Sequence, residues 1–130
     1  MKNRIEIVKD YGDLPEIECF PNQLNQVFMN LLVNAAQAIP RRGTLTIKTL
    51  RVGNEVQVKI SDTGVGIPRE NMRKIFDPGF TTKGVGVGTG LGLSICYKII
   101  QDHRGRIAVE SEVGRGTTFT ITLPVSISAS

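Results

Sequence analysis

Two asparagines, Asn30 and Asn34, lie four residues apart in the segment "NQVFMNLLVNAAQAI", and Gln37 follows three residues later. In a helix these positions share one face. Asparagine is a poor helix former because its side chain competes for backbone hydrogen bonds. A carboxamide oxygen is a neutral, hard ligand that suits Mg²⁺, with phosphate oxygens and waters completing the octahedron. The pair is therefore a candidate metal and phosphate site, and the alternative is that the amides simply face water.

A second candidate is the segment "SDTGVGIP", which follows the predicted strand "VQVKI". Asp62 lies at the end of that strand, and Gly64 and Gly66 permit a tight turn and the close approach of a flat ligand. A carboxylate at this place can accept a hydrogen bond from an exocyclic amine. Because D-T-G is also a common turn, the segment alone leaves an ordinary loop as the alternative.

The third candidate is "GFTTKGVGVGTGLGLSI", from Gly79 to Ile95, which is rich in glycine. The chain contains neither the P-loop spacing nor G-x-G-x-x-G, which excludes two common phosphate-binding loops. A glycine loop that leads into a helix still exposes free N–H groups and the positive end of the helix dipole. The stretch from Gly90 to Ser94 is placed for that role, and a flexible loop is the alternative.

The elements that must position these residues follow from residue periodicity. Alternation predicts strands over 3–12, 16–20, 44–52 and 55–62, and a second hairpin over 105–124 that turns near Val113 and Gly114. Helices are predicted over 68–76, 91–103 and, most clearly, Gln23–Ile39. The apolar stripe of that last helix is Leu24, Val27, Phe28, Leu31, Ala35 and Ala38.

The predicted order of elements is β-β-α-β-β-α-loop-α-β-β. Because strands come in hairpins, we expect a two-layer α/β sandwich with a mixed, mostly antiparallel sheet and helices on one face. The 130 residues suit one domain. A turn at Gly53 and Asn54 would join the two central strands.

Composition narrows the functional classes. The net charge is +4, but the basic residues are scattered and not interleaved with aromatics, which disfavours nucleic acid as a partner. No apolar run is long enough to span a membrane, and the start does not resemble a signal peptide. Cys19 and Cys96 match no metal spacing and are interpreted as buried, reduced thiols of an intracellular, cytoplasmic protein.

The order of five segments carries a family resemblance. "NQVFMNLLVNAAQAI", "SDTGVGIP", "IFDPGFTTK", "GTGLGLSI" and "GRGTTFTI" resemble the N, G1, F, G2 and G3 boxes of bacterial sensor histidine kinases. The resemblance runs from about Arg4 to Pro124 and identifies the chain as similar to the catalytic and ATP-binding domain of the GHKL superfamily. It implies ATP and Mg²⁺ as cofactors.

The resemblance also implies roles for individual residues. Asn34 matches the Mg²⁺ ligand, Asn30 the second catalytic asparagine near the phosphates, and Asp62 the carboxylate that accepts from the adenine amine. Gly64, Gly66 and Thr117 match residues beside the base. Phe76 and Phe80 match the border of an ATP lid over 78–89. The remaining nucleotide contacts would be Lys83, Gly88, Thr89, Gly90, Leu91, Gly92 and Leu93.

Asn30 separates two activities within the superfamily. ATPases of this class carry a glutamate at this position to activate water, and an amide is no useful general base near neutral pH. The sequence therefore predicts a kinase that keeps its γ-phosphoryl group for a histidine, with a GHKL ATPase or nucleotide switch as the alternative. His103 lacks a following acidic residue, so it is not expected to be the phosphoacceptor, and the resemblance implies a structural role for it.

The phosphoaccepting histidine is then expected on a separate dimerisation domain. The chain is interpreted as a fragment, 1–130, that lacks this domain, does not autophosphorylate alone and is monomeric. A response regulator would be an indirect partner, and no membrane contact is expected. Gln37 replaces the basic residue that several families carry near the phosphates, so the cation that assists transfer is left open.

Overall fold

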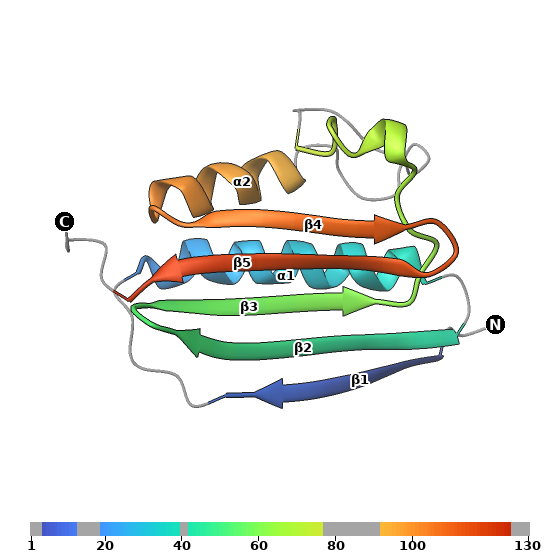
Figure 1. Cartoon of the computed structure of the whole chain (residues 1–130), viewed down its shortest axis with the longest axis horizontal. Helices are drawn as coiled ribbons and strands as arrows, with labels where there is room; N and C mark the ends of the chain where they lie inside the picture. The colour runs from blue at the N-terminus through green and yellow to red at the C-terminus, as the bar shows by residue number, and fades with distance from the viewer. Residues whose placement is uncertain (1–3, 13–18, 40–41, 77–91, 126–130) are drawn as a thin grey trace.

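The computed structural model describes residues 4–12, 19–39, 42–76 and 92–125. Five strands form one sheet in the order β1-β2-β3-β5-β4, with helices α1 (Pro21–Ala38) and α2 (Gly92–Asp102) (Figure 1). The strands are β1 (Arg4–Tyr11), β2 (Arg42–Val52), β3 (Glu55–Asp62), β4 (Arg106–Glu112) and β5 (Gly116–Pro124).

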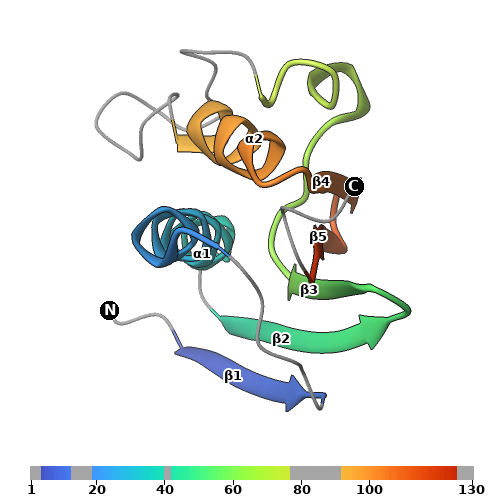
Figure 2. The same cartoon turned by 90° about the vertical axis from the view of Figure 1, so that its left-hand side faces the viewer.

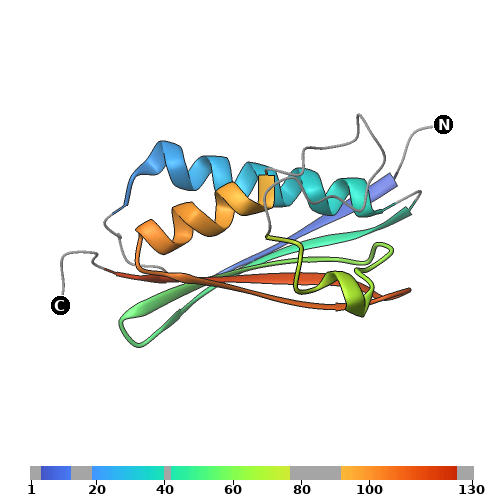
Figure 3. The ribbon, with the colours of Figure 1, turned by 90° about the horizontal axis from the view of Figure 1, so that it is seen from above.

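The sheet is mixed, as the sequence predicts. β1 pairs with β2 in parallel, because α1 forms the crossover between them, and the other pairs are antiparallel. Both helices lie on the same face of the sheet, α1 over its middle and α2 nearer β4 (Figures 2 and 3). The two-layer α/β sandwich is therefore confirmed. Within the described ranges, neither helix is long and apolar enough to cross a membrane.

The core lies between the helices and the sheet. Of the predicted stripe on α1, four residues are buried and Phe28 and Ala38 are partly buried. Alternate residues of β3 and β5 meet this stripe from below, as expected for a sheet covered on one side. The buried apolar side chains of these three elements are Leu24, Val27, Leu31, Ala35, Val56, Ile60, Phe119, Ile121 and Leu123.

Two predicted elements are wrong in part. The strand over 16–20 is not seen at Cys19 and Phe20, and 16–18 lie outside the described residues. Phe20 instead caps α1, where its carbonyl oxygen accepts from the N–H of Leu24 at 3.1 Å. The predicted helix over 68–76 is a single 3₁₀ turn, η1 (Arg69–Asn71), followed by turns. Such a short segment cannot offset the cost of helix nucleation.

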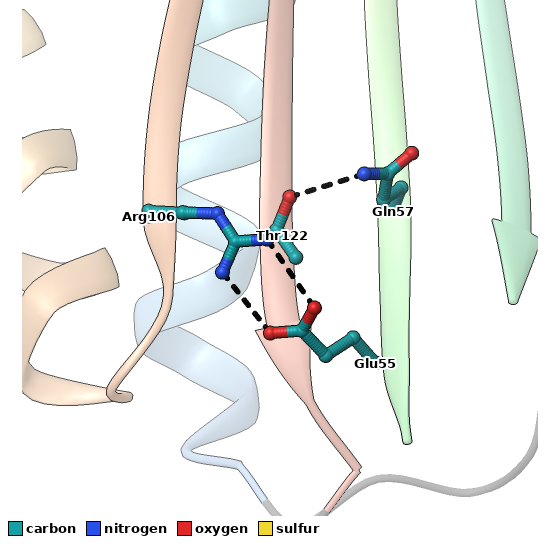
Figure 4. A network of polar contacts seen from close by, with 4 residues as sticks. All are labelled: Glu55, Gln57, Arg106 and Thr122. Atoms are coloured by element: carbon teal, nitrogen blue, oxygen red, sulfur yellow. Dashed lines mark hydrogen bonds and ion pairs between the residues drawn. The ribbon is translucent and has the colours of Figure 1, made fainter. Parts of the chain in front are cut away.

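A polar network on the uncovered face joins β3, β5 and β4 (Figure 4). Arg106 donates to both oxygens of Glu55, at 3.1 and 3.3 Å, and Gln57 donates to Thr122 at 3.5 Å. The ion pair spans β5 near its C-terminal end, because Glu55 pairs with Pro124 and Arg106 with Thr122. This network lies at the opposite end of β3 from Asp62.

We expect Glu55→Gln to lower the free energy of unfolding by less than ~1 kcal/mol, because exposed ion pairs contribute little. The side chains of Arg106 and Glu55 are 67% and 39% exposed, so solvent screens their attraction. Urea unfolding of the variant and of the parent chain measures the difference. A loss of several kcal/mol would contradict this view of the network.

Candidate functional site

The last residues of β3 lie beside the first residues of β5. Asp62 pairs with Thr117 in the antiparallel register, and both side chains are buried, with exposed fractions of 6% and 5%. Ser111 of β4 is the next neighbour of Thr117 in the sheet. The three positions therefore form one polar row across β3, β5 and β4 at the end of a largely apolar face.

The loop after β3 is held between α1 and the β4–β5 turn. The N–H of Gly64 donates to Oδ1 of Asp62 at 2.8 Å, which turns the chain sharply at the strand end. The N–H of Val65 donates to the carbonyl oxygen of Ala38, the last residue of α1, at 2.9 Å. On the other side, Gly114 donates to the carbonyl oxygen of Val65 at 3.0 Å. The loop is therefore fixed at both flanks.

Two glycines make this packing possible. A Cβ on Gly64 would lie 2.3 Å from the carbonyl oxygen of Ala38, so only glycine lets the loop approach α1 so closely. Gly66 has φ +79°, in the region that favours glycine, and a Cβ there would meet the carbonyl oxygen of Glu112. Their predicted role beside a bound base is not tested by this packing, but the need for glycine is explained.

The two asparagines belong to α1 and are both partly buried, whereas Gln37 is exposed. Nδ2 of Asn30 contacts Sγ of Cys96 in α2 at 3.8 Å, which places this amide at the α1–α2 interface. Asn34 comes one turn, about 6 Å along the axis, before Ala38 and its contact with the Asp62 loop. The sequence-predicted base and metal residues are therefore brought to neighbouring parts of one region.

The resemblance implies a bound Mg²⁺ ion, so the side chains of this region must suit that metal as ligands. Among the residues that the structure describes, no group of three or more His, Cys, Asp or Glu side chains could hold a metal ion. Asn34 offers one neutral hard oxygen, which fits a Mg²⁺ ion held mainly by phosphate oxygens and waters. The residues present therefore fit a metal that arrives with a nucleotide.

Several predicted site residues fall outside the described residues. These are Lys83, Gly88, Thr89, Gly90 and Leu91, together with Phe80 and the proposed lid over 78–89. Gly92 begins α2, and Leu93 is partly buried there against the core. Phe76 packs against Tyr97 of α2 and Phe119 of β5, with ring centroids 5.3 and 6.4 Å apart.

The only histidine is part of the fold. His103 is 1% exposed, its Nε2 accepts from the N–H of Phe20 at 3.0 Å, and its Nδ1 contacts the carbonyl oxygen of Ile99 at 2.8 Å. Because a carbonyl oxygen only accepts, Nδ1 carries the proton and Nε2 is the acceptor. The ring also meets Phe20 edge-on at 5.5 Å. These contacts explain why His103 is structural, as the sequence predicts.

The two cysteines differ in their surroundings. Both are free thiols; Cys96 is fully buried as expected, but Cys19 is only partly buried, which corrects the prediction for it. Burial raises the pKa of the Cys96 thiol above its usual value of 9.0, although the hydrogen bond from Asn30 lowers that pKa in part. Cys96 is therefore a neutral thiol that packs between the two helices.

This shift predicts a pH dependence of stability. The folded chain holds the Cys96 proton more tightly than the unfolded chain, so stability is complete below pH 9.0 and falls as the pH rises above it. We expect Cys96→Val to reduce the stability lost between about pH 8 and about pH 10 in urea unfolding. Cys19→Ala is the matched control and should leave that loss unchanged. An undiminished loss in Cys96→Val would contradict the assignment.

Sequence reasoning missed Ser111 and the contact between Asn30 and Cys96. Ser111 follows Ile107 and Val109 at alternate positions of β4, and all three are partly buried. That alternation was the available signal, since it places a hydroxyl on the covered face of the sheet. The Asn30 contact joins residues 66 apart in sequence, and no local pattern reports it.

The sequence profile of one family matches residues 20–127, which is most of the chain. That family is described as histidine kinase-, DNA gyrase B- and HSP90-like ATPase. The chain belongs to this family. A curated relative, Sporulation kinase E of Bacillus subtilis (strain 168), is 48% identical over 115 residues, which cover 87% of this chain. The match covers only 15% of that kinase.

Solved structures agree with this membership. The catalytic domain of histidine kinase ThkA superposes with a TM-score of 0.84 at 36% identity, covering 95% of this chain and 80% of that one. ThkA is also known in complex with response regulator protein TrrA, where the TM-score is 0.80 at 31% identity, over 97% and 36% of the chains. Full-length ShkA in complex with AMPPNP gives 0.83 at 27% identity, over 97% and 27%. The resemblance to histidine kinase catalytic domains is confirmed.

Proposed function

We propose that this domain binds Mg·ATP and donates the γ-phosphoryl group to a histidine on a separate dimerisation domain in two-component signalling. The observation that carries the proposal is the position of Asp62, a buried carboxylate at the end of β3. The loop that follows Asp62 contacts the end of α1 at Ala38, one helical turn after Asn34. Family membership supports nucleotide binding. The similar structure of ShkA in complex with AMPPNP supports nucleotide binding as well.

In this proposal the base lies where the end of β3 meets the start of β5, and the phosphates lie toward α1 and α2. Asp62 accepts from the exocyclic amine of adenine, and the fixed loop with Gly64 and Gly66 borders the ring. Asn34 holds the Mg²⁺ that comes with the phosphates, and a bound Mg²⁺ neutralises phosphate charge. Backbone N–H groups at the start of α2, from Gly92 onward, supply donors for phosphate oxygens.

Asn30 favours a kinase over an ATPase. Its carboxamide has no basic site near neutral pH, so it cannot take a proton from an attacking water. Its Nδ2 contacts Cys96, which holds the amide at the helix interface. The domain would therefore keep its ATP intact until a partner histidine arrives. In this proposal the domain is cytoplasmic and monomeric, and a response regulator is reached through the partner that carries the histidine.

Two measurements test the assignment. Incubated alone with Mg·ATP that is labelled on its γ-phosphoryl group, the chain should release phosphate slowly and should not become labelled itself. With a dimerisation domain of the parent kinase, labelled phosphate should appear on that domain in an acid-labile, alkali-stable form. Rapid phosphate release by the chain alone would favour the ATPase alternative and overturn the kinase assignment.

Replacing Asn34 tests the metal role. We expect Asn34→Ala to reduce the gain in nucleotide affinity that Mg²⁺ provides by about tenfold or more, because one metal ligand is lost. Asn25→Ala is the matched control, since it removes an exposed amide of the same type from the N-terminal part of the same helix. Calorimetric titration with ADP, with Mg²⁺ and with EDTA, measures the gain. An unchanged gain in Asn34→Ala would remove this residue from the metal site.

A further inference from the structure

The hydroxyl of Ser111 connects three parts of the candidate base site. Its Oγ lies 2.7 Å from the N–H nitrogen of Ile67, 3.0 Å from the carbonyl oxygen of Gly116 and 2.7 Å from Oγ1 of Thr117. Thr117 in turn pairs with Asp62 across the sheet. Ser111 therefore touches the loop after β3, the start of β5 and the neighbour of the buried carboxylate at once.

Hydrogen-bond chemistry fixes the direction of each of these contacts. A hydroxyl has one proton and two lone pairs. The N–H of Ile67 can only donate and takes one lone pair of Ser111, whereas the carbonyl oxygen of Gly116 can only accept and takes its proton. One lone pair of Ser111 remains, so Thr117 must donate its own proton to it. Oγ1 of Thr117 is left with acceptor lone pairs only.

Two hydrogen-bond acceptors therefore lie side by side, Asp62 at the end of β3 and Thr117 at the start of β5. Asp62 accepts from the N–H of Gly64 through Oδ1, and an ionised carboxylate has no proton to donate. With the Thr117 hydroxyl also restricted to accepting, this place suits a ligand edge that donates. An exocyclic amine does so, whereas a keto oxygen would face acceptors and lose its own hydrogen bonds from water.

We propose that Ser111 is a positioning residue for purine specificity: it orients the Thr117 hydroxyl as an acceptor, so that the site selects 6-aminopurine over 6-oxopurine nucleotides. This inference rests on the proposed function, because it requires that a purine nucleotide binds beside Asp62. Without Ser111, the Thr117 proton is free to turn toward a keto oxygen. Discrimination should then weaken more than overall binding.

The test compares ADP with IDP, which has a keto oxygen at the 6-position and a proton on the adjacent ring nitrogen N1, and which carries no added 2-amino group. Calorimetric titration of the parent chain should show tighter binding of ADP. In Ser111→Ala the ratio of the two affinities should fall about fivefold to tenfold, the value of one hydrogen bond. A merely structural role for Ser111 would weaken both nucleotides by the same factor, which would overturn the proposal.

Ser61→Ala is a matched control. Ser61 and Thr118 form a similar cross-strand hydroxyl pair at 3.0 Å, one position away from Asp62 and Thr117 in each strand and therefore on the opposite face of the sheet. This variant should leave the ratio unchanged. A fall equal to that of Ser111→Ala would show that any lost hydroxyl pair relaxes specificity, which would overturn the assignment to Ser111.

Thr117 provides a second variant should Ser111→Ala fail to fold. Thr117→Val removes the oriented acceptor, and Thr117→Ser keeps it. The ratio should fall in the first and persist in the second; a ratio that persists in both overturns the inference. If the parent chain binds ADP but the ratio does not respond, only this inference fails. If the folded parent chain binds neither nucleotide, the proposed function fails with it.

Discussion

Asp62→Ala is expected to lower the affinity of the chain for ADP by about 100-fold, the combined effect of losing a charged hydrogen bond and leaving its partner unpaired. The side chain is 6% exposed, so water cannot easily replace it. Asp62→Asn keeps the shape of the side chain but turns one acceptor into a donor, and it should bind almost as poorly. Calorimetric titration with ADP measures both variants.

Asp102→Ala is the control for this experiment. Asp102 is an exposed carboxylate at the end of α2, and its loss changes the net charge by the same amount. It should leave the affinity for ADP unchanged. If Asp62→Ala were folded and bound ADP as tightly as the parent chain, the base site would lie elsewhere.

Gly116→Ala is expected to lower the free energy of unfolding by more than ~2 kcal/mol, because it combines strain with overlap. Gly116 has φ +129°, and a Cβ there would lie 1.9 Å from the carbonyl oxygen of Asp62. The two strands must separate to admit the methyl group, so the row from Asp62 to Thr117 should be disturbed. Urea unfolding measures the stability, and titration with ADP measures the site.

Gly53→Ala separates the two causes. Gly53 also has a positive φ, +62°, but a Cβ there would meet nothing within 4 Å. Its replacement should therefore cost only the backbone term, about 1 kcal/mol. Equal losses in both variants would mean that the close approach of β5 to Asp62 is not what requires glycine at position 116.

Local patterns predicted the parts of the fold that depend on local interactions. The stripe on α1 can be predicted because its apolar residues repeat at helical spacing, and four of them are buried in the structure. The β2–β3 hairpin was visible because Gly53 can adopt the turn conformation, and it does so with φ +62°. The predicted strand at 16–20 is wrong at Phe20, because this residue caps α1 and contacts His103, and no local pattern reports a contact between residues 83 apart.

The candidate site was predicted less completely. Asp62, Asn30 and Asn34 carry chemistry in their residue types, so the sequence alone points to them. Ser111 acts through the register of β4 on β5 and through a loop 44 residues earlier in the chain. Such relations arise only when distant segments pair. The residues between Asp77 and Leu91 lie outside the described ones, so the roles assigned there stay predictions.

The proposed site for Mg·ATP is formed by Asp62 and Asn34. Calorimetric titration of the folded chain with ADP and with a non-hydrolysable ATP analogue, each with Mg²⁺ and with EDTA, tests it most directly. We expect micromolar-range binding of both nucleotides that weakens when the metal is removed. A folded chain that binds neither nucleotide, or binds them equally well in EDTA, would contradict it.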